Sequence, residues 1–197
     1  MRSFKTELKL NNQQKTLCEK HVGTARFAYN WGLSICETAY EIDEGRPTAI
    51  DLHKYFVRDE KSIKPWLYEI SKATPQLAFM NLDKAYKNFF RSKGKSHLPT
   101  YKKKGIYDSF GLEGTIKVNE KSIQVPKLGK LKTFEKLPTN AKPKMCIINK
   151  TAGRWFISFI SNTEEFTYKS NGLVVGVDLG IRTLATLSNG KTFKNPK

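Results

Sequence analysis

A single aspartate near the end of the chain stands where metal-dependent chemistry could occur. Asp178 lies within Gly176-Val177-Asp178-Leu179-Gly180, at the end of an apolar run that begins at Leu173. The run predicts a buried strand whose tip presents a carboxylate beside a tight glycine turn. Carboxylate oxygens bind Mg²⁺, and clusters of acids hold the metal pair of many nucleases, where the metals activate water. An aspartate before glycine is also a common turn residue, and actin-like ATPases open with similar texture, so the motif alone leaves three interpretations open.

The charge of the chain is the strongest bulk signal. The 197 residues include 35 Lys and Arg against 18 Asp and Glu, a formal net charge of +17. This excess favours a polyanionic partner, with nucleic acid first and an anionic membrane surface second. Residues 84–104 hold eight basic side chains and no acidic one, and residues 121–154 hold nine with one acid, Glu135. The aromatic side chains that lie among them are Tyr86, Phe89, Phe90, Tyr101, Phe134 and Trp155.

Such a pattern fits nucleic acid because Lys and Arg neutralise phosphates while flat rings stack on bases. The alternative is a solvated basic surface over an ordinary aromatic core. The chain has no apolar run of about 18 residues and no signal-peptide core, so a cytoplasmic protein without a membrane contact is expected. Cys18, Cys36 and Cys146 lie far apart and form no CxxC pair, which predicts reduced thiols and no zinc site within this chain.

The first half of the chain predicts a strand and then helices. Residues 3–10 alternate as in a strand, Asn11 or Asn12 can cap a helix through His21, and Val22-Gly23 interrupts it. A second helix is expected from Thr24, so residues 13–45 predict a helix-turn-helix, with Arg26 and Asn30 off its apolar stripe.

Two further helices are predicted before residue 95. Thr48 caps a short one, and Thr74-Pro75 is a start signal for a longer helix that runs to about Phe90. The side chains of Lys84, Lys87 and Arg91 fall in a row on the outward face of this longer helix.

After Gly94 the pattern changes to short strands. Strand-like runs cover 109–112, 115–118, 122–125, 130–134, 144–150 and 154–161, the last two joined by a hairpin turn at 151–153. A polar linker at 162–172, the run ending at Asp178 and a hairpin turning at Asn189-Gly190 follow. The last 20 residues need partners to form a core. The order predicts an α+β protein in which helices are inserted into a β-barrel and a further unit begins.

The whole chain resembles the TnpB (OrfB) proteins of insertion sequences, the ancestors of the compact type V CRISPR effectors. The resemblance lies in many loose motifs in the family's order: residues 21–31, Pro65-Trp66-Leu67, 82–90, 98–104, 125–129, 153–158, 176–183 and Asn195-Pro196-Lys197.

The family implies a fold and a nuclease site. A wedge-like β-barrel would take residues 1–10 and 100–170, a helical recognition domain 11–95, and the start of a RuvC-type, RNase H-like domain 171–197. Asp178 matches the first catalytic acid of that domain, a ligand for Mg²⁺ only in a completed site. The later acids and the zinc ribbon of the family are missing, so we expect a chain truncated after the first RuvC motif and without nuclease activity alone, whether by natural truncation, a split reading frame or a domain boundary.

The family also implies partners, namely a guide RNA and a double-stranded target DNA. Candidates for base edges are the amides of Asn30, Gln76 and Asn81, which could instead be surface or capping groups. Candidates for phosphate contact, each of which could instead be a solvated cation, are Arg26, Lys84, Lys87, Arg91, Lys93, Lys95, Lys102, Lys103 and Lys104.

Two other functions remain open at this point. The chain could be a helix-turn-helix DNA-binding regulator derived from a transposase, which would prefer a short palindromic duplex to structured RNA. It could also be a fragment of an actin-like ATPase, although 172 residues of largely basic sequence precede the motif. The sequence does not indicate an oligomeric state.

Overall fold

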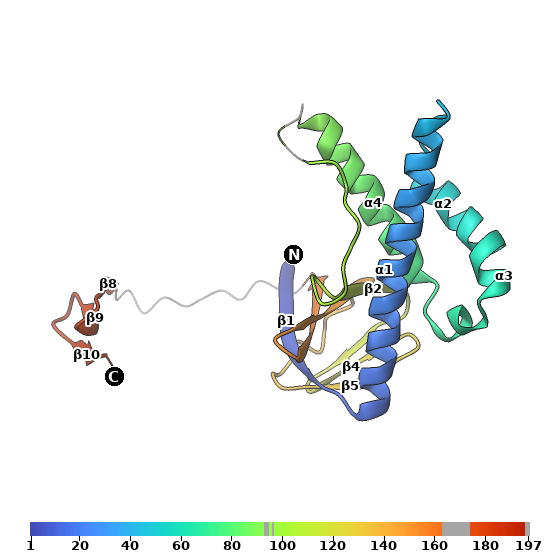
Figure 1. Cartoon of the computed structure of the whole chain (residues 1–197). Coiled ribbons are helices and arrows are strands. Elements are labelled where there is room, and N and C mark those ends of the chain that lie inside the picture. Colours follow the sequence, from blue (N-terminus) through green and yellow to red (C-terminus); the bar gives the residue numbers. More distant parts are fainter. Residues whose placement is uncertain (93–94, 96, 163–173, 196–197) are drawn as a thin grey trace. The chain divides into compact units, whose positions relative to one another are not determined.

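The computed structural model describes residues 1–92, 95, 97–162 and 174–195 (Figure 1). The chain divides into two compact units, Met1–Thr163 and Glu164–Lys197. The second holds β8 (Val177–Leu179), β9 (Thr183–Leu187) and β10 (Thr192–Lys194). The elements of the first are β1 (Arg2–Lys9), α1 (Asn12–Glu41), α2 (Ala49–Tyr55), η1 (Phe56–Glu60), α3 (Lys61–Ile63), η2 (Pro65–Glu69), α4 (Ala73–Arg91), β2 (Ser109–Glu113), β3 (Lys117–Asn119), β4 (Ser122–Val125), β5 (Gly129–Thr133), β6 (Met145–Thr151) and β7 (Arg154–Ser161).

Helix α1 is one continuous helix of 30 residues, so the predicted interruption at Val22-Gly23 is wrong. Asn11 caps it as expected, because its side chain accepts from the Gln14 amide while Gln14 bonds back. Thr24 caps nothing, since its hydroxyl donates to the carbonyl of Lys20 within the helix. Burial of Val22 and its neighbours outweighs the cost of one helical glycine, about 1 kcal/mol.

The first unit holds a seven-stranded antiparallel sheet in the order β2-β6-β7-β1-β5-β4-β3. Strand β1 stands in its middle: its first six residues pair with β7 and its last two, Leu8 and Lys9, pair with β5. The hairpin between β6 and β7 turns at Ala152 and Gly153, both with positive φ, which matches the turn predicted there. The N-terminal strand therefore ties together two ladders made more than a hundred residues later.

The described strands do not close into the expected barrel, because β2 and β3 end the sheet without pairing with each other. The start of α4 occupies the edge of β2, where the Thr74 hydroxyl donates to the carbonyl of Gly111 at 3.2 Å. A Cβ at Gly111 would lie 2.4 Å from Leu77 Cδ1, so α4 packs as close as a glycine allows. This edge is thus covered by a helix rather than by another strand.

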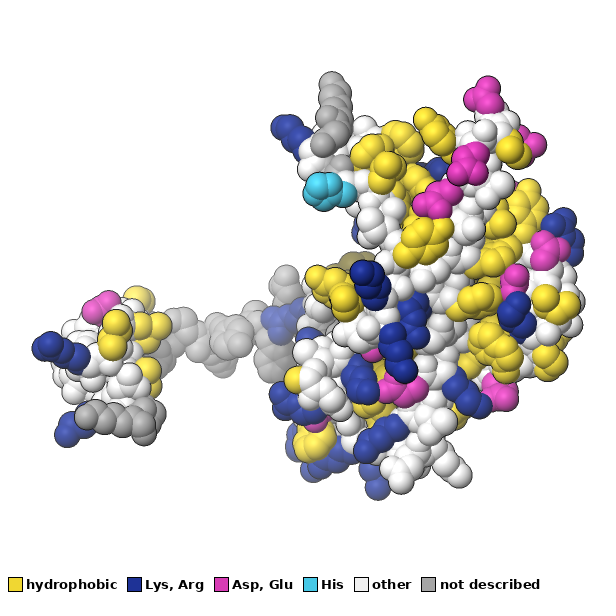
Figure 2. Space-filling view, in the orientation of Figure 1, with side chains coloured by type: hydrophobic (Ala, Val, Ile, Leu, Met, Phe, Trp, Pro, Cys, Tyr) yellow, Lys and Arg dark blue, Asp and Glu magenta, His cyan; other side chains and the backbone are white. Residues whose placement is uncertain are grey.

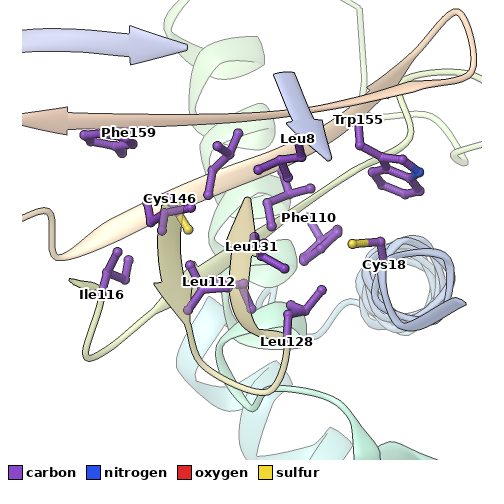
Figure 3. Packing of buried hydrophobic residues seen from close by; sticks show 14 of the residues in the cluster. Leu8, Cys18, Phe110, Leu112, Ile116, Leu128, Leu131, Cys146, Trp155 and Phe159 are labelled. Carbon is purple, nitrogen blue, oxygen red and sulfur yellow. The ribbon is translucent and has the colours of Figure 1, made fainter. Parts of the chain in front are cut away.

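The inner face of the sheet and the N-terminal half of α1 share one hydrophobic core. Figure 3 shows Cys18 of α1 pointing toward the strand residues Leu131 and Phe110, with Trp155 above it. Cys18 is fully buried and burial raises its pKa to about 12, so this thiol is a packing group. The sheet core consists of α1 residues up to Ala25, the inward residues of the strands, and buried residues of the connecting segments such as Ile116 and Leu128.

A second core lies among the helices. Phe79 and Leu82 of α4, Leu52 of α2 and Phe56 of η1 are almost fully buried against the C-terminal half of α1. The rings of Phe56 and Phe79 meet edge to face, with centroids 5.5 Å apart. Helix α4 begins one residue before the predicted Thr74 and ends one residue after the predicted Phe90.

The second unit is a small sheet in the order β10-β9-β8. Its hairpin turns at Asn189-Gly190 as predicted, with Gly190 at φ +83°. Val177, Leu179 and Phe193 are exposed, so its described residues form no buried core. The predicted linker at 162–172 falls almost wholly outside the described residues. The overall α+β class is confirmed, whereas these three strands do not by themselves establish a RuvC-like domain. Among the described residues, no helix has the length and apolar content that crossing a membrane would need.

Candidate nucleic-acid interface

The segment that follows α4 returns along α1 and is fastened to it (Figure 1). The Asn30 side chain makes two hydrogen bonds with the backbone of Lys102: its amide donates to the carbonyl at 3.0 Å, and its oxygen accepts from the N–H at 2.8 Å. Asn30 was predicted to read a base edge. In the structure its amide positions the segment that carries Lys102, Lys103 and Lys104.

Two further contacts fasten the same segment on either side of Asn30. Arg26 forms an ion pair with Asp108 at 3.5 Å, and Asp108 also accepts from the backbone of Gly105 at 3.2 Å. Toward the other end of α1, the Tyr101 hydroxyl donates to the Glu37 carboxylate. Residues 26, 30 and 37 lie on one side of the helix, so residues 101–108, which we call the strap, run antiparallel to α1 along that side.

The strap presents its lysines in different ways. The Lys102 ammonium lies 4.1 Å from the ring centre of Tyr29, and desolvation lowers its pKa although much of the residue is exposed. Lys103 and Lys104 are exposed and form no ion pair with a described residue. The two lysines at the centre of the strap are therefore free to meet an anion.

On α4, the side chains of Lys84, Lys87 and Arg91 are all exposed, as their spacing predicts. Lys87 is held by Asp83, with Nζ and Oδ2 2.6 Å apart, and Asp83 also pairs with Arg46 at 2.8 Å. Desolvation raises the pKa of Asp83, but the hydrogen bonds from Lys87 and Arg46 outweigh it and leave this pKa below its ordinary value. The positive charge of Lys87 is thus compensated in part, because one carboxylate is shared by two cations.

The remaining predicted residues lie near α4 or outside the described chain. Asn81 is exposed on α4 and Gln76 is half-buried near its start. Lys95 is exposed, and its backbone N–H donates to Ser92 at 3.2 Å. Lys93 lies outside the described residues.

The charges of the first unit are unevenly distributed. Figure 2 shows Lys and Arg side chains in a column beside the lower half of α1 and gathered where β1 runs into α1, whereas Asp and Glu gather at the C-terminal end of α1. The electrostatic potential of this face is therefore more positive beside the strap and the sheet end than at the C-terminal end of α1.

Asp178 stands in β8, opposite Thr186 of β9, and is exposed. It is the one acid of the described second unit, and the described chain contains no group of three or more His, Cys, Asp or Glu side chains that could hold a metal ion. One carboxylate does not fit a two-metal centre, so no hydrolytic step can be derived from these residues.

Sequence reasoning missed the acids that organise this face. Asp108 pairs with Arg26, Glu37 accepts from Tyr101, and Asp83 pairs with Lys87. The only available signal was an Asp beside a run of basic residues, and its partner Arg26 lies 82 positions away. Long-range pairs of this kind leave no local pattern.

Comparisons with known proteins point in one direction. A family model described as a helix-turn-helix domain, named for OrfB of IS605, matches residues 1–45. The InsQ protein of Escherichia coli (strain K12), named as a candidate RNA-guided DNA endonuclease, is 26% identical over 198 residues, covering 98% of this chain and 49% of its own length. A protein of Streptomyces pristinaespiralis with the same kind of name is 26% identical over 203 residues, covering 100% and 50%. The chain spans about half the length of these curated relatives.

The matched residues 1–45 contain β1 and the uninterrupted α1. The match supports the resemblance to OrfB proteins from which the helix-turn-helix was expected. In the structure, however, this segment contains no turn between helices. This segment therefore presents one long helix, not a short recognition helix that follows a turn.

Proposed function

We propose that this chain is the nucleic-acid-binding portion of a TnpB-type transposon protein, a proposal that the matching family model and the two relatives support. Its ligands would be a guide RNA and double-stranded target DNA, by analogy with the names of the relatives. The observation that carries the proposal is the strap, which α1 holds at three points and which leaves Lys103 and Lys104 exposed without a described ion-pair partner.

In this proposal the strap and α4 bind phosphates. Lys103 and Lys104, together with Lys84 and Arg91, offer charges that no described carboxylate compensates. Arg26 and Asn30 act as positioning residues, because their side chains bond Asp108 and the backbone of Lys102. Lys87 contributes less than its neighbours since Asp83 holds it. Contacts of this kind set affinity and register rather than sequence preference.

Nuclease activity would depend on carboxylates beyond the described residues. Asp178 would supply one ligand to a divalent metal, whose chemistry is to activate water and stabilise the leaving oxygen. Its neighbours Val177 and Leu179 are apolar and exposed, which fits a strand that packs within a sheet larger than the three described strands. The isolated chain would therefore bind nucleic acid without cleaving it, and the domain bounds drawn from the family remain part of this proposal.

The proposal is tested by titrating labelled structured RNA and duplex DNA with the chain at about 50 and 200 mM salt. We expect affinity to fall about tenfold or more across this range, because bound lysines release counterions. The quadruple variant Lys84→Glu, Arg91→Glu, Lys103→Glu, Lys104→Glu should lose most of this binding. Its two halves, Lys84→Glu with Arg91→Glu and Lys103→Glu with Lys104→Glu, are each compared with Lys117→Glu with Lys121→Glu, exposed on the β3–β4 hairpin, which makes the same change of charge.

Two results would contradict the proposal. Equal loss in the control pair would mean that only net charge matters. Salt-insensitive binding would remove phosphate contacts as its basis. A preference for a short palindromic duplex over structured RNA would instead support the transposase-derived regulator, although the absence of a turn within α1 leaves that function without its usual recognition element.

A further inference from the structure

A second basic surface lies on the sheet, away from the strap. It is a groove of about 620 Å³ between the start of α1, β1, β5 and the β6–β7 turn. Five basic side chains and a single acid, Glu7, line it, together with the aromatic residues Phe134 and Trp155. The basic side chains are those of Lys9, Lys15, Lys130, Lys132 and Arg154.

The lysines of this groove have no described carboxylate partner, and two of them lie opposite each other. Lys9 of β1 lies directly opposite Lys132 of β5 in the ladder, and Lys130 is two residues away on the same exposed face. Like charges directly opposite in a ladder are destabilising. Arg154 forms an ion pair with Glu7, in which Nη1 and Oε2 are 3.3 Å apart. No described carboxylate pairs with the four lysines of the groove.

An aromatic ring stands beside this cluster. Phe134 directly follows β5 and its side chain is 53% exposed, which is unusual for a phenylalanine next to a well-packed sheet. The Lys9 ammonium lies 4.2 Å from its ring centre. The backbone N–H of Phe134 donates to the carbonyl of Glu7 at 3.0 Å, so the ring is held at a fixed place on the sheet.

The backbone beneath the groove is held in place by packing and a hydrogen bond. The Gln14 side chain donates to the carbonyl of Lys130 at 3.0 Å, which fastens the first turn of α1 to β5. Leu131, between the two lysines of β5, is fully buried. The cations therefore project from a preorganised surface, and an anion bound there need not order it first.

We propose that this groove binds a single-stranded segment of nucleic acid, with its phosphates among the four lysines and one base stacked on Phe134. A ring can accept a base only when that base is free of duplex pairing and stacking, which selects a single strand. A phosphate between Lys9 and Lys132 relieves their mutual repulsion. The inference rests on the proposed function, to which it adds a site separate from the strap and a class of ligand.

The test measures the affinity of the whole chain for a fluorescent single-stranded oligouridine and for duplex DNA of equal length. Lys130→Glu with Lys132→Glu should weaken oligouridine binding about tenfold or more, whereas Lys117→Glu with Lys121→Glu, the same charge change outside the groove, should change it far less. Phe134→Ala should cost the single strand about fivefold or more and spare the duplex, and Phe134→Tyr should retain the affinity.

Stability separates this role from a structural one. Lys132→Glu places an opposite charge across from Lys9, so its melting temperature should be unchanged or higher while its affinity falls. A lower melting temperature in this variant would assign the lysines to the fold and overturn the inference. If the wild-type chain binds nucleic acid and the groove variants bind equally well, the groove is refuted and the proposed function stands. If the wild type binds neither ligand, both fail.

Discussion

The two halves of α1 differ in what they pack against, although they form one helix. Cys18, Val22 and Ala25 belong to the core of the sheet, whereas Ala28 and Leu33 belong to the core of the helices. The two cores are therefore coupled by an unbroken row of backbone hydrogen bonds. A strain on either core is transmitted to the other through the helix, which a hinged pair of short helices would not do.

The two glycines of α1 show the same contrast at close range. A Cβ at Gly23, which lies between Val22 and Ala25 near the end of the part of α1 that packs in the sheet core, would have no other atom within 4 Å. A Cβ at Gly32 would lie 3.0 Å from Phe79 Cδ1 and 3.2 Å from Leu82 Cδ2. A side chain can therefore be added at Gly23 without a clash, whereas Gly32 is required by the close packing of α4.

The largest effect is expected from Gly23→Pro, which should uncouple the two cores. Proline removes one helical hydrogen bond and clashes with the carbonyl one turn earlier, at a cost of about 3 kcal/mol or more. Trp155 reports on the sheet core and Trp31 on the helical core. With the other tryptophans changed to Phe, the two urea transitions should coincide in the parent and separate in the proline variant.

Gly23→Ala is the matched control and should act in the opposite direction. Its methyl group meets nothing and favours the helix, so stability should rise by about 0.5–1 kcal/mol while the two transitions still coincide. If the proline variant also unfolds with coincident transitions, α1 is not what couples the cores.

A smaller loss is expected from Gly32→Ala, about 1–3 kcal/mol, because Phe79 and Leu82 are fully buried and have no room to retreat. Chemical denaturation measures it. Combining the change with Phe79→Leu should cost less than the sum of the two single changes, since the smaller side chain relieves the overlap. Strict additivity would show that Gly32 is not limited by Phe79.

The smallest effect concerns His21, which fastens α1 beside the junction. Its Nδ1 donates to the carbonyl of Leu17 at 2.7 Å, its Nε2 accepts from the Ser71 N–H at 3.2 Å, and its ring lies 4.9 Å from that of Phe110. Burial lowers the pKa of His21 below 6.5, opposed by the Leu17 contact and assisted by Lys127. Protonation of Nε2 would place its N–H against the Ser71 N–H, so this hydrogen bond would be lost.

Because the pKa is lower in the folded state, the unfolded chain binds more protons as pH falls below about 6.5, and stability must decrease with it. Between about pH 7.5 and 6 only the first part of this loss appears. His21→Gln, whose amide does not titrate in this range, should flatten the slope. His53, whose pKa burial also lowers, accounts for a remaining part. An unchanged slope in the glutamine variant would exclude His21 as its source.

Local patterns predicted several elements well. The caps at Asn11 and Thr48 and the turn at Asn189-Gly190 follow from residue types whose effect is confined to one turn of chain. The start of α4 was placed within one residue, but Thr74 does not cap it: this residue lies inside the helix and its hydroxyl donates to Gly111. The interruption at Gly23 was wrong because a helix's tolerance of glycine depends on burial elsewhere along it. The order of strands could not be read, since the pairing of β1 with β5 and β7 has no local signature.

The candidate interface was predicted by composition rather than by geometry. Exposure of Lys84 and Arg91 follows from helical periodicity, and it is observed. The ion pair at Lys87 and the bonds from Asn30 to Lys102, 72 positions apart, arise only in the folded chain. The separation of a strap from a groove on the sheet depends on the same long-range contacts.

The central place of β1 in the sheet has a consequence for synthesis on the ribosome. The strand emerges first, yet Arg2 pairs with Ser161, so it must wait for nearly the whole first unit to be translated. Residues 28–86, by contrast, already contain the entire helical core, and this core can form while the later strands are still inside the exit tunnel. We therefore expect α1 to be anchored at one end early, with its N-terminal half and β1 held as a ready template onto which β5 and β7 assemble as they appear.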